Sequence, residues 1–133
     1  MRFRYLLPAI AWTVIIFFII AIPGSSIPDS SLFQIPHFDK IIHAGIFFFL
    51  GLSSVYGFTK QGNTTILKSY AYTSAVIFCV IYGGLTEVIQ HFFIAERSGE
   101  MADFTANTIG SVAGVAVFYY LTKTQKIRKI LSL

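Results

Sequence analysis

Charged residues are scarce in this sequence. Among 133 residues there are ten Lys and Arg and six Asp and Glu, together 12% of the chain. A soluble domain carries roughly 25% charged residues, because its surface must be solvated. Hydrophobic residues make up 55% of the chain and include 14 Phe, so much of the surface must face something other than water. The composition excludes an ordinary water-soluble domain and favours a membrane protein.

Several chemical signatures are also missing. Cys79 is the single cysteine, so an intrachain disulfide is excluded, and within an apolar run it is expected to pack in a helix. No basic stripe interleaved with aromatic residues accompanies the net charge of +4, so a nucleic-acid partner is not expected. There is no Gly-x-Ser-x-Gly or His-Glu-x-x-His motif, which leaves no nucleophile or zinc-protease signature. No repeat or linker divides the chain, and we expect one domain over residues 1–133.

Long apolar runs dominate what is present. About 20 apolar residues form a helix that spans the ~30 Å hydrocarbon core of a bilayer. Four segments qualify: residues 5–22, 41–58, 70–93 and 104–121. No strand-like alternation competes with them. The sequence therefore predicts an all-α, four-helix transmembrane bundle.

Basic residues near these segments predict the orientation of the bundle. With the N-terminus in the cytoplasm, eight Lys and Arg lie on the inner face and only Lys40 and Arg97 on the outer face. We therefore expect a multi-pass plasma-membrane protein with both termini cytoplasmic. Arg2 and Arg4 before an apolar run also resemble a secretory signal, but the run is longer than the 7–15 residues of a signal core. The outer connection, residues 23–38, is expected to lie on the membrane surface or to dip partway into it.

Polar residues gather near the predicted outer ends of three spans. They are Asp39, Lys40, His43, Glu87, Gln90, His91, Arg97, Asp103 and Asn107. Within each span several of them are three or four residues apart, which places them on one helix face. A carboxylate within a spanning helix costs about 2.5–3.5 kcal/mol. Glu87, roughly 9 Å below the end of its helix, is therefore a functional-site candidate that should face the bundle interior.

Some of these residues have purely structural alternatives. Asp39 and Asp103 stand at helix N-termini, where a carboxylate can cap free N–H groups, and Asn107 can serve as an interhelical hydrogen bond. The small residues Ala106, Gly110 and Gly114 predict close packing of the fourth helix.

Metal binding is a further alternative for the polar cluster. Carboxylates and histidines are metal-ligand types, but their spacing here is not diagnostic, and ion pairs with Lys40 and Arg97 explain the same residues. We therefore expect no metal. The alternative ligand set is Asp39, His43, Glu87, His91 and Asp103.

The ordered motifs resemble the VanZ-like family of bacterial membrane proteins. An Asp-Lys-x-x-His segment (39–43) precedes a Glu-x-x-Gln segment (87–90), an Arg at position 97 and an Asp-x-x-x-Asn-x-x-Gly segment (103–110). The resemblance extends from the first span through the fourth and implies the membrane fold and these site positions. The family's namesake is associated with resistance to the lipoglycopeptide teicoplanin in Gram-positive bacteria, while many relatives have no assigned role.

Two classes of function fit this pattern. The first is binding or modification of a lipid-linked or cell-envelope component at an outer polar site, with membrane lipids as partners. The second is a membrane-embedded hydrolase or transferase acting on a lipid, with general acid–base chemistry and an anion held by Arg97. A transporter would need polar groups on the cytoplasmic side as well. The catalytic candidates are His43 and Glu87, and the binding candidates are Asp39, Lys40, Gln90, Arg97, Asp103 and Asn107.

Overall fold

The computed structural model describes residues 2–26, 37–62 and 66–131, and this part of the chain is helical without any β-strand. The all-α class predicted from the sequence is confirmed. Most of the outer connection, residues 27–36, lies outside the described residues. The elements are η1 (Phe3–Tyr5), α1 (Leu7–Ile20), η2 (Gly24–Ser26), α2 (Phe38–Thr59), α3 (Ile66–Ser69), α4 (Ala71–Phe93), α5 (Met101–Lys123) and α6 (Gln125–Ile130).

Three helices in the described residues, α2, α4 and α5, are long and apolar enough to cross a membrane. With 22 or 23 residues each, they are about 33–35 Å long at 1.5 Å per residue. Both α2 and α5 begin three residues before the apolar segments that predicted them. The reason is that their polar first turns, which contain Asp39 and Asp103, are helical although they are not hydrophobic.

The first apolar segment forms a shorter helix than the predicted span over residues 5–22. Helix α1 has 14 residues, about 21 Å, and is preceded by the 3-10 turn η1. It ends at Ile20 shortly before Pro23, because a proline disfavours helical backbone in the residue before it. A crossing of the membrane by this segment stays a prediction.

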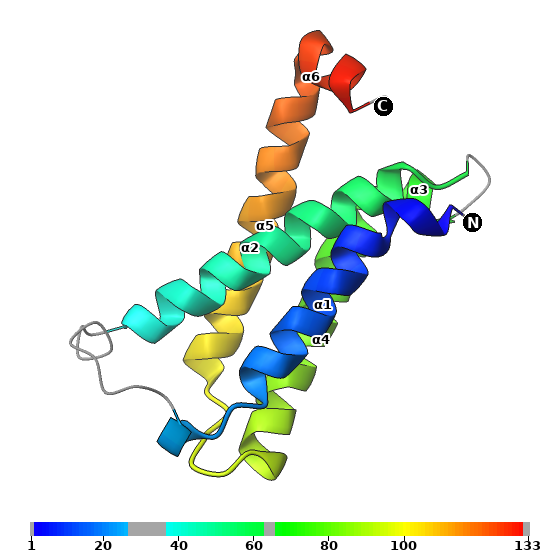
Figure 1. The fold of residues 1–133 in the computed structure, drawn as a ribbon. Helices are drawn as coiled ribbons and strands as arrows, with labels where there is room; N and C mark the ends of the chain where they lie inside the picture. The colour runs from blue at the N-terminus through cyan, green and yellow to red at the C-terminus, as the bar shows by residue number, and fades with distance from the viewer. Residues whose placement is uncertain (1, 27–36, 63–65, 132–133) are drawn as a thin grey trace.

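Helix α1 is attached to α2 and α4 by hydrogen bonds near its middle. The indole Nε1 of Trp12 donates to the carbonyl oxygen of Ile46 on α2 at 2.7 Å. The hydroxyl of Tyr82 on α4 donates to the carbonyl oxygen of Thr13 at 2.8 Å. Buried Ile16 and Ile20 pack against Phe47 in the same region. These contacts place α1 along the other helices rather than apart from them (Figure 1).

Helices α2 and α5 cross in close contact because glycines line the crossing. A Cβ atom at Gly110 would overlap the carbonyl oxygen of Ala44, and one at Gly114 would overlap that of Phe48. The predicted packing role of the small residues on this helix is confirmed. The crossing brings the first turns of α2 beside the first turns of α5, which positions the polar residues described below.

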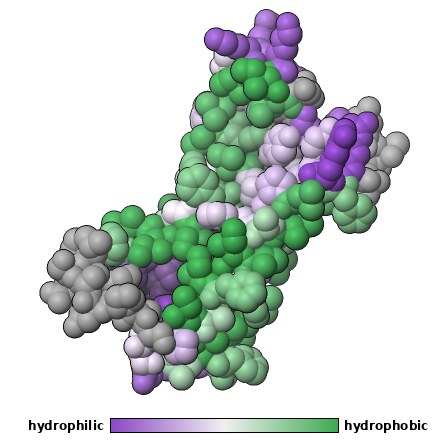
Figure 2. All heavy atoms as spheres, in the orientation of Figure 1, coloured by the Kyte–Doolittle hydropathy of each residue, from purple (hydrophilic) through white to green (hydrophobic). Residues whose placement is uncertain are grey.

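The molecule has two polar ends separated by an apolar band. We call the end with η1, α3 and α6 the terminal end, and the end with η2 and the α4–α5 loop (residues 94–100) the distal end (Figure 1). Figure 2 shows hydrophilic residues over α6 and around η1, with mostly hydrophobic residues between these and the distal end. Large apolar side chains such as Phe18, Ile81 and Phe92 are two-thirds exposed or more. An exposed apolar surface of this extent fits contact with membrane lipid.

Candidate functional site

Glu87 lies at the centre of a buried polar cluster at the distal end. The residue is 8% exposed, and its carboxylate is held by two N–H donors. The side-chain amide of Asn107 on α5 donates to Oε1 at 3.0 Å, and the backbone N–H of Glu100 donates to Oε2 at 3.2 Å. Because an unpaired buried carboxylate is costly, these donors are what stabilise it at this depth.

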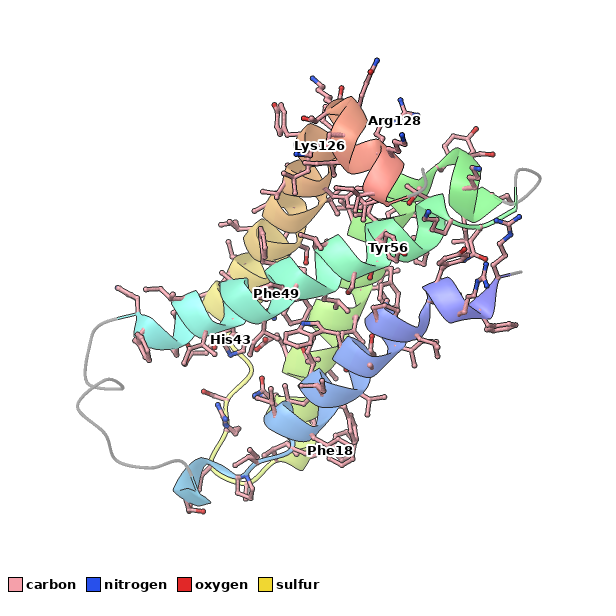
Figure 3. The ribbon with its side chains drawn as sticks, turned by 45° about the horizontal axis from the view of Figure 1, so that its top comes forward. Phe18, His43, Phe49, Tyr56, Lys126 and Arg128 are labelled. Carbon is pink, nitrogen blue, oxygen red and sulfur yellow. The ribbon has the colours of Figure 1, made fainter. Side chains whose placement is uncertain are left out.

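His43 on α2 completes this cluster. Its Nδ1 is 3.0 Å from Oδ1 of Asn107 and 3.8 Å from Oε1 of Glu87. The Asn107 amide nitrogen already points at Glu87, so Oδ1 faces His43 and can only accept. Nδ1 must therefore carry the proton, which leaves Nε2 as an acceptor in the neutral ring. In Figure 3, Tyr56 lies in the half of α2 near the terminal end, and His43 lies in the other half. We call Glu87, Asn107 and His43 the Glu87 cluster.

Gln90 lies beside the Glu87 cluster without joining its hydrogen bonds. It is 3% exposed and, with His43 and Thr86, lines a cavity of about 40 Å³ next to Ile16 and Ile20 of α1. The rest of its lining is Ile and Phe, so the cavity is mainly apolar. Although Glu87 and Gln90 are three residues apart on one face of α4, their side chains therefore have different neighbours.

Lys40 is the centre of a second cluster, nearer the distal surface. Its Nζ atom pairs with Asp39 at 2.7 Å, Glu100 at 2.9 Å and Asp103 at 2.9 Å. Asp103 is buried, whereas Asp39 and Glu100 are about half exposed. These pairs join the first turn of α2 to the first turn of α5. We call these four residues the Lys40 cluster.

Neither aspartate is the N-cap residue of its helix. The N-cap residues are His37 for α2 and Glu100 for α5, and neither makes a side-chain capping hydrogen bond. Asp39 and Asp103 lie inside the first turns, where a carboxylate still interacts favourably with the positive end of the helix dipole. Their direct partner is the Lys40 ammonium group.

The acidic groups that come together differ from the alternative metal set. Oxygen atoms of Asp39, Glu100 and Asp103 lie within 4.8 Å of one another, and His43, Glu87 and His91 are not part of that group. The ammonium group of Lys40 sits among these oxygens, so a divalent ion would have to displace it. Ion pairing of Asp39 and Asp103 with Lys40 is what the geometry shows.

Arg97 does not pair with the carboxylates as expected from the sequence. Within the described residues its Nε is buried without a hydrogen-bond partner, while Lys40 takes Asp103 and two N–H donors take Glu87. The physical reason lies in the loop. Glu96 adopts the left-handed region at φ 57°, and Gly99 packs so closely on the Glu87 carbonyl that a Cβ would overlap it. The loop therefore presents Glu100, not Arg97, to the buried groups.

Glu100 is the residue that sequence reasoning missed. Its backbone N–H binds Glu87 and its side chain binds Lys40, so it joins the two clusters. Its position directly after Gly99 and before the first helical residue of α5 was the available signal, since a loop glycine often permits close backbone approach.

A groove opens beside the Glu87 cluster between α4 and α5. It has a volume of about 410 Å³, and its wall is mainly apolar, with Val88, Phe92, Met101 and Phe104. Glu87, His91 and Glu100 are its ionisable lining residues. Val88, Phe92 and Met101 are between 50% and 76% exposed, so the groove is continuous with the apolar outer surface. We call it the α4–α5 groove.

A family model described as VanZ/LLP1 matches residues 5–123. The chain belongs to the VanZ/LLP1 family. The resemblance predicted from the ordered motifs is thus confirmed, and the matched region includes both polar clusters and the groove. Comparison with curated proteins and with solved structures gives no match. As a VanZ/LLP1-family member with three candidate membrane helices among its described residues, the protein is a helical membrane protein.

Proposed function

We propose that this VanZ/LLP1-family protein binds an amphiphilic component of the cell envelope, a lipid or lipid-linked molecule, in the α4–α5 groove. One observation carries the proposal. Buried Glu87, the centre of the polar cluster, is one of the residues that line an apolar groove whose rim is exposed at the lipid-facing surface. A hydrocarbon chain would lie along Val88, Phe92 and Met101, and the polar part of the ligand would reach Glu87.

The charge of the groove favours a particular kind of polar group. Its ionisable residues are Glu87, His91 and Glu100, with no Lys or Arg in the described lining. Two carboxylates repel a phosphate and attract hydrogen-bond donors. Sugar hydroxyls or amino groups of a lipid-linked envelope component therefore suit this wall.

The hydrogen bonds of His43 favour a second candidate function. The chain from Glu87 through Asn107 to Nδ1 of His43 orients the imidazole as a base is oriented in many hydrolases and transferases. In this alternative, Nε2 would accept a proton from water or from a substrate hydroxyl at the outer leaflet. Purified protein incubated with extracted envelope lipids should then yield a new lipid species that His43→Ala does not yield. Unchanged lipid profiles with both proteins would reject the enzymatic alternative.

We also propose that the chain crosses the membrane four times with both termini in the cytoplasm. Residues 3–20 form an almost continuous helical stretch from η1 through α1, roughly 27 Å long when 3-10 and α-helical rises are combined. This length approaches the hydrocarbon thickness. Eight Lys and Arg at the terminal end against two at the distal end support the orientation. In this orientation the groove would lie on the outer side.

A link to glycopeptide susceptibility follows from the family's namesake. If the envelope component is the target of teicoplanin or its precursor, expression of the protein should raise the teicoplanin concentration that inhibits a susceptible Gram-positive host. The Glu87→Gln variant, expressed at the same level, should not. Equal inhibition with the empty vector, the wild type and the variant would reject this link.

The groove can be tested by filling it. Gly84 lines the groove, and a Cβ there meets only a ring carbon of Phe104 at 3.5 Å. Gly84→Leu should leave the protein folded and reduce the co-purifying amphiphile detected by lipid mass spectrometry about tenfold. Gly45→Leu is the matched control, because a Cβ at Gly45 has no neighbour within 4 Å. Equal lipid content in the two variants would contradict the proposed binding place.

A further inference from the structure

A cavity of about 500 Å³ lies at the terminal end of the bundle, and the α4–α5 groove is at the opposite end. Five cationic residues from five successive parts of the chain line it. They are Arg2 before η1, Lys60 at the end of α2, Lys68 in α3, Lys123 at the end of α5 and Arg128 in α6. Such convergence does not follow from helix packing alone, because like charges repel when they are brought together.

No Asp or Glu among the described residues lines this basic cavity. The sequence has no acidic residue between Lys40 and Thr86 or after Asp103, so the helices around the cavity supply no carboxylate side chain. Two of the cations have a ring or a backbone carbonyl as a partner. Lys123 Nζ lies 4.7 Å from the centre of the Tyr119 ring, and Lys60 Nζ donates to the carbonyl oxygen of Leu131. The cavity therefore carries a concentrated positive potential that an anion would neutralise.

Hydroxyl groups and a nearby apolar surface add to this charge. Tyr72 and Tyr119 also line the cavity, and their hydroxyls can donate hydrogen bonds to anionic oxygens. Thr59 and Thr122 line it too, but their hydroxyls donate to backbone carbonyls of their own helices. Tyr119, Tyr120 and Leu121, which precede Lys123 in α5, are 44–66% exposed. Tyrosines at the end of a spanning helix mark the membrane interface, so the cavity lies at headgroup level with acyl-chain contacts beneath it.

We propose that the basic cavity binds the phosphates of an anionic phospholipid from the leaflet at the terminal end. Basic pockets between transmembrane helices are suited to such headgroups. Five cations match a headgroup with two phosphates better than one with a single phosphate. Cardiolipin should therefore bind more tightly than phosphatidylglycerol, and zwitterionic phosphatidylcholine should bind weakest. The inference does not depend on the ligand of the α4–α5 groove, which is at the opposite end.

The test measures lipid binding to the full chain purified in detergent, by the rise in thermal-unfolding temperature with added cardiolipin, phosphatidylglycerol or phosphatidylcholine. The double variant Lys123→Gln, Arg128→Gln should bind cardiolipin about tenfold more weakly than the wild type. Lys126→Gln, Lys129→Gln is the matched control. It removes the same charge from the same end of the chain, but neither residue lines the cavity, and its affinity should stay within about twofold.

Two further measurements distinguish a lipid from a free phosphate and test whether charge alone determines binding. Sodium pyrophosphate without lipid should produce a much smaller shift than cardiolipin, and an equal shift would overturn the lipid assignment. The charge-preserving variant Lys123→Arg, Arg128→Lys should retain binding. Because Lys123 and Arg128 are both exposed, substitutions at these two positions should not unfold the protein. Equal losses in the two Gln double variants, or no loss in either, would overturn the proposed site.

Discussion

Asn107 holds two polar groups of different helices at once. Its amide nitrogen donates to Glu87 on α4, and its amide oxygen accepts from His43 on α2, while Asn107 itself is 1% exposed. A residue that satisfies two buried partners contributes more than a single hydrogen bond, because its loss removes a hydrogen bond from both of them. This small network is the structural support of the proposed site.

Replacing Asn107 therefore should affect stability strongly. Asn107→Leu should lower the free energy of unfolding by about 2–4 kcal/mol, since a buried carboxylate and an imidazole N–H lose their partner. Denaturant titration of the purified protein in detergent measures this. Thr108→Val is the control, because the Thr108 hydroxyl bonds only the Phe104 carbonyl of its own helix, and its cost should be about 1 kcal/mol or less. Similar values for the two variants would show that the network does not stabilise the bundle.

Lys40 offers a second test at the residue scale. Lys40→Met leaves three carboxylates without their cation and should destabilise by about 1–3 kcal/mol, less than a fully buried pair because Asp39 and Glu100 are half exposed. Adding Asp103→Asn should recover part of the loss, because Asp103 is the buried member. The coupling from a double-mutant cycle should be about 1 kcal/mol or more. A coupling near zero would mean that the Lys40–Asp103 pair contributes nothing.

At the scale of the helices, the crossing of α2 and α5 sets the distance between the site residues on α2 and those on α5. Gly110 faces Ala44 one turn before Gly114 faces Phe48, and Asp103 and Asn107 lie one to two turns earlier on the same helix. Any increase in helix separation at the crossing would therefore pull Asn107 from His43 and Asp103 from Lys40.

Gly110→Leu should consequently abolish stable folding or cost more than about 3 kcal/mol, because the new side chain would meet backbone rather than a movable side chain. Gly45→Ala on α2 is its counterpart. With open space around its Cβ, it should be neutral or stabilise by up to about 1 kcal/mol. Thermal unfolding of the purified variants distinguishes them. A Gly110→Leu protein as stable as the wild type would mean that the helices do not approach as described.

The positions of the long helices were more predictable from the sequence than the conformation of the α4–α5 loop. Apolar runs located α2, α4 and α5 within a few residues, and helical spacing placed Glu87, His43 and Asn107 at one end. The contact of Glu100 with Glu87 was not predictable, because it depends on the left-handed backbone of Glu96 and on Gly99 packing against another helix. The length of α1 was overestimated for a different reason, since hydropathy does not record where a helix changes to a 3-10 turn.

On the scale of the whole molecule, charge is divided between the two ends. The terminal end has eight of the ten Lys and Arg, and the five described carboxylates lie from Asp39 to Asp103 at the distal end. Under the cytoplasmic assignment of the termini, the acidic site faces outward and the basic cavity faces the anionic inner leaflet. The two proposed sites would then serve opposite membrane faces.

Cysteine labelling tests this orientation. Cys79 is fully buried and should give little background. A membrane-impermeant maleimide applied to whole cells should label Ser98→Cys, in the exposed α4–α5 loop, and should reach Lys126→Cys only after permeabilisation. Labelling in the reverse order would place the termini outside and invert the assignment.

The most direct test of the central proposal is lipid mass spectrometry of the purified protein. The wild type should retain an amphiphile with hydroxyl or amino donors, and Glu87→Gln should lose about nine-tenths of it while remaining folded, because glutamine keeps the shape of the side chain and one of its two acceptor oxygens but not its charge. Glu96→Gln, an exposed residue outside the groove, should retain the full amount. An amphiphile present equally in all three proteins, or in none, would contradict the assignment of Glu87 and the α4–α5 groove as a lipid-binding site.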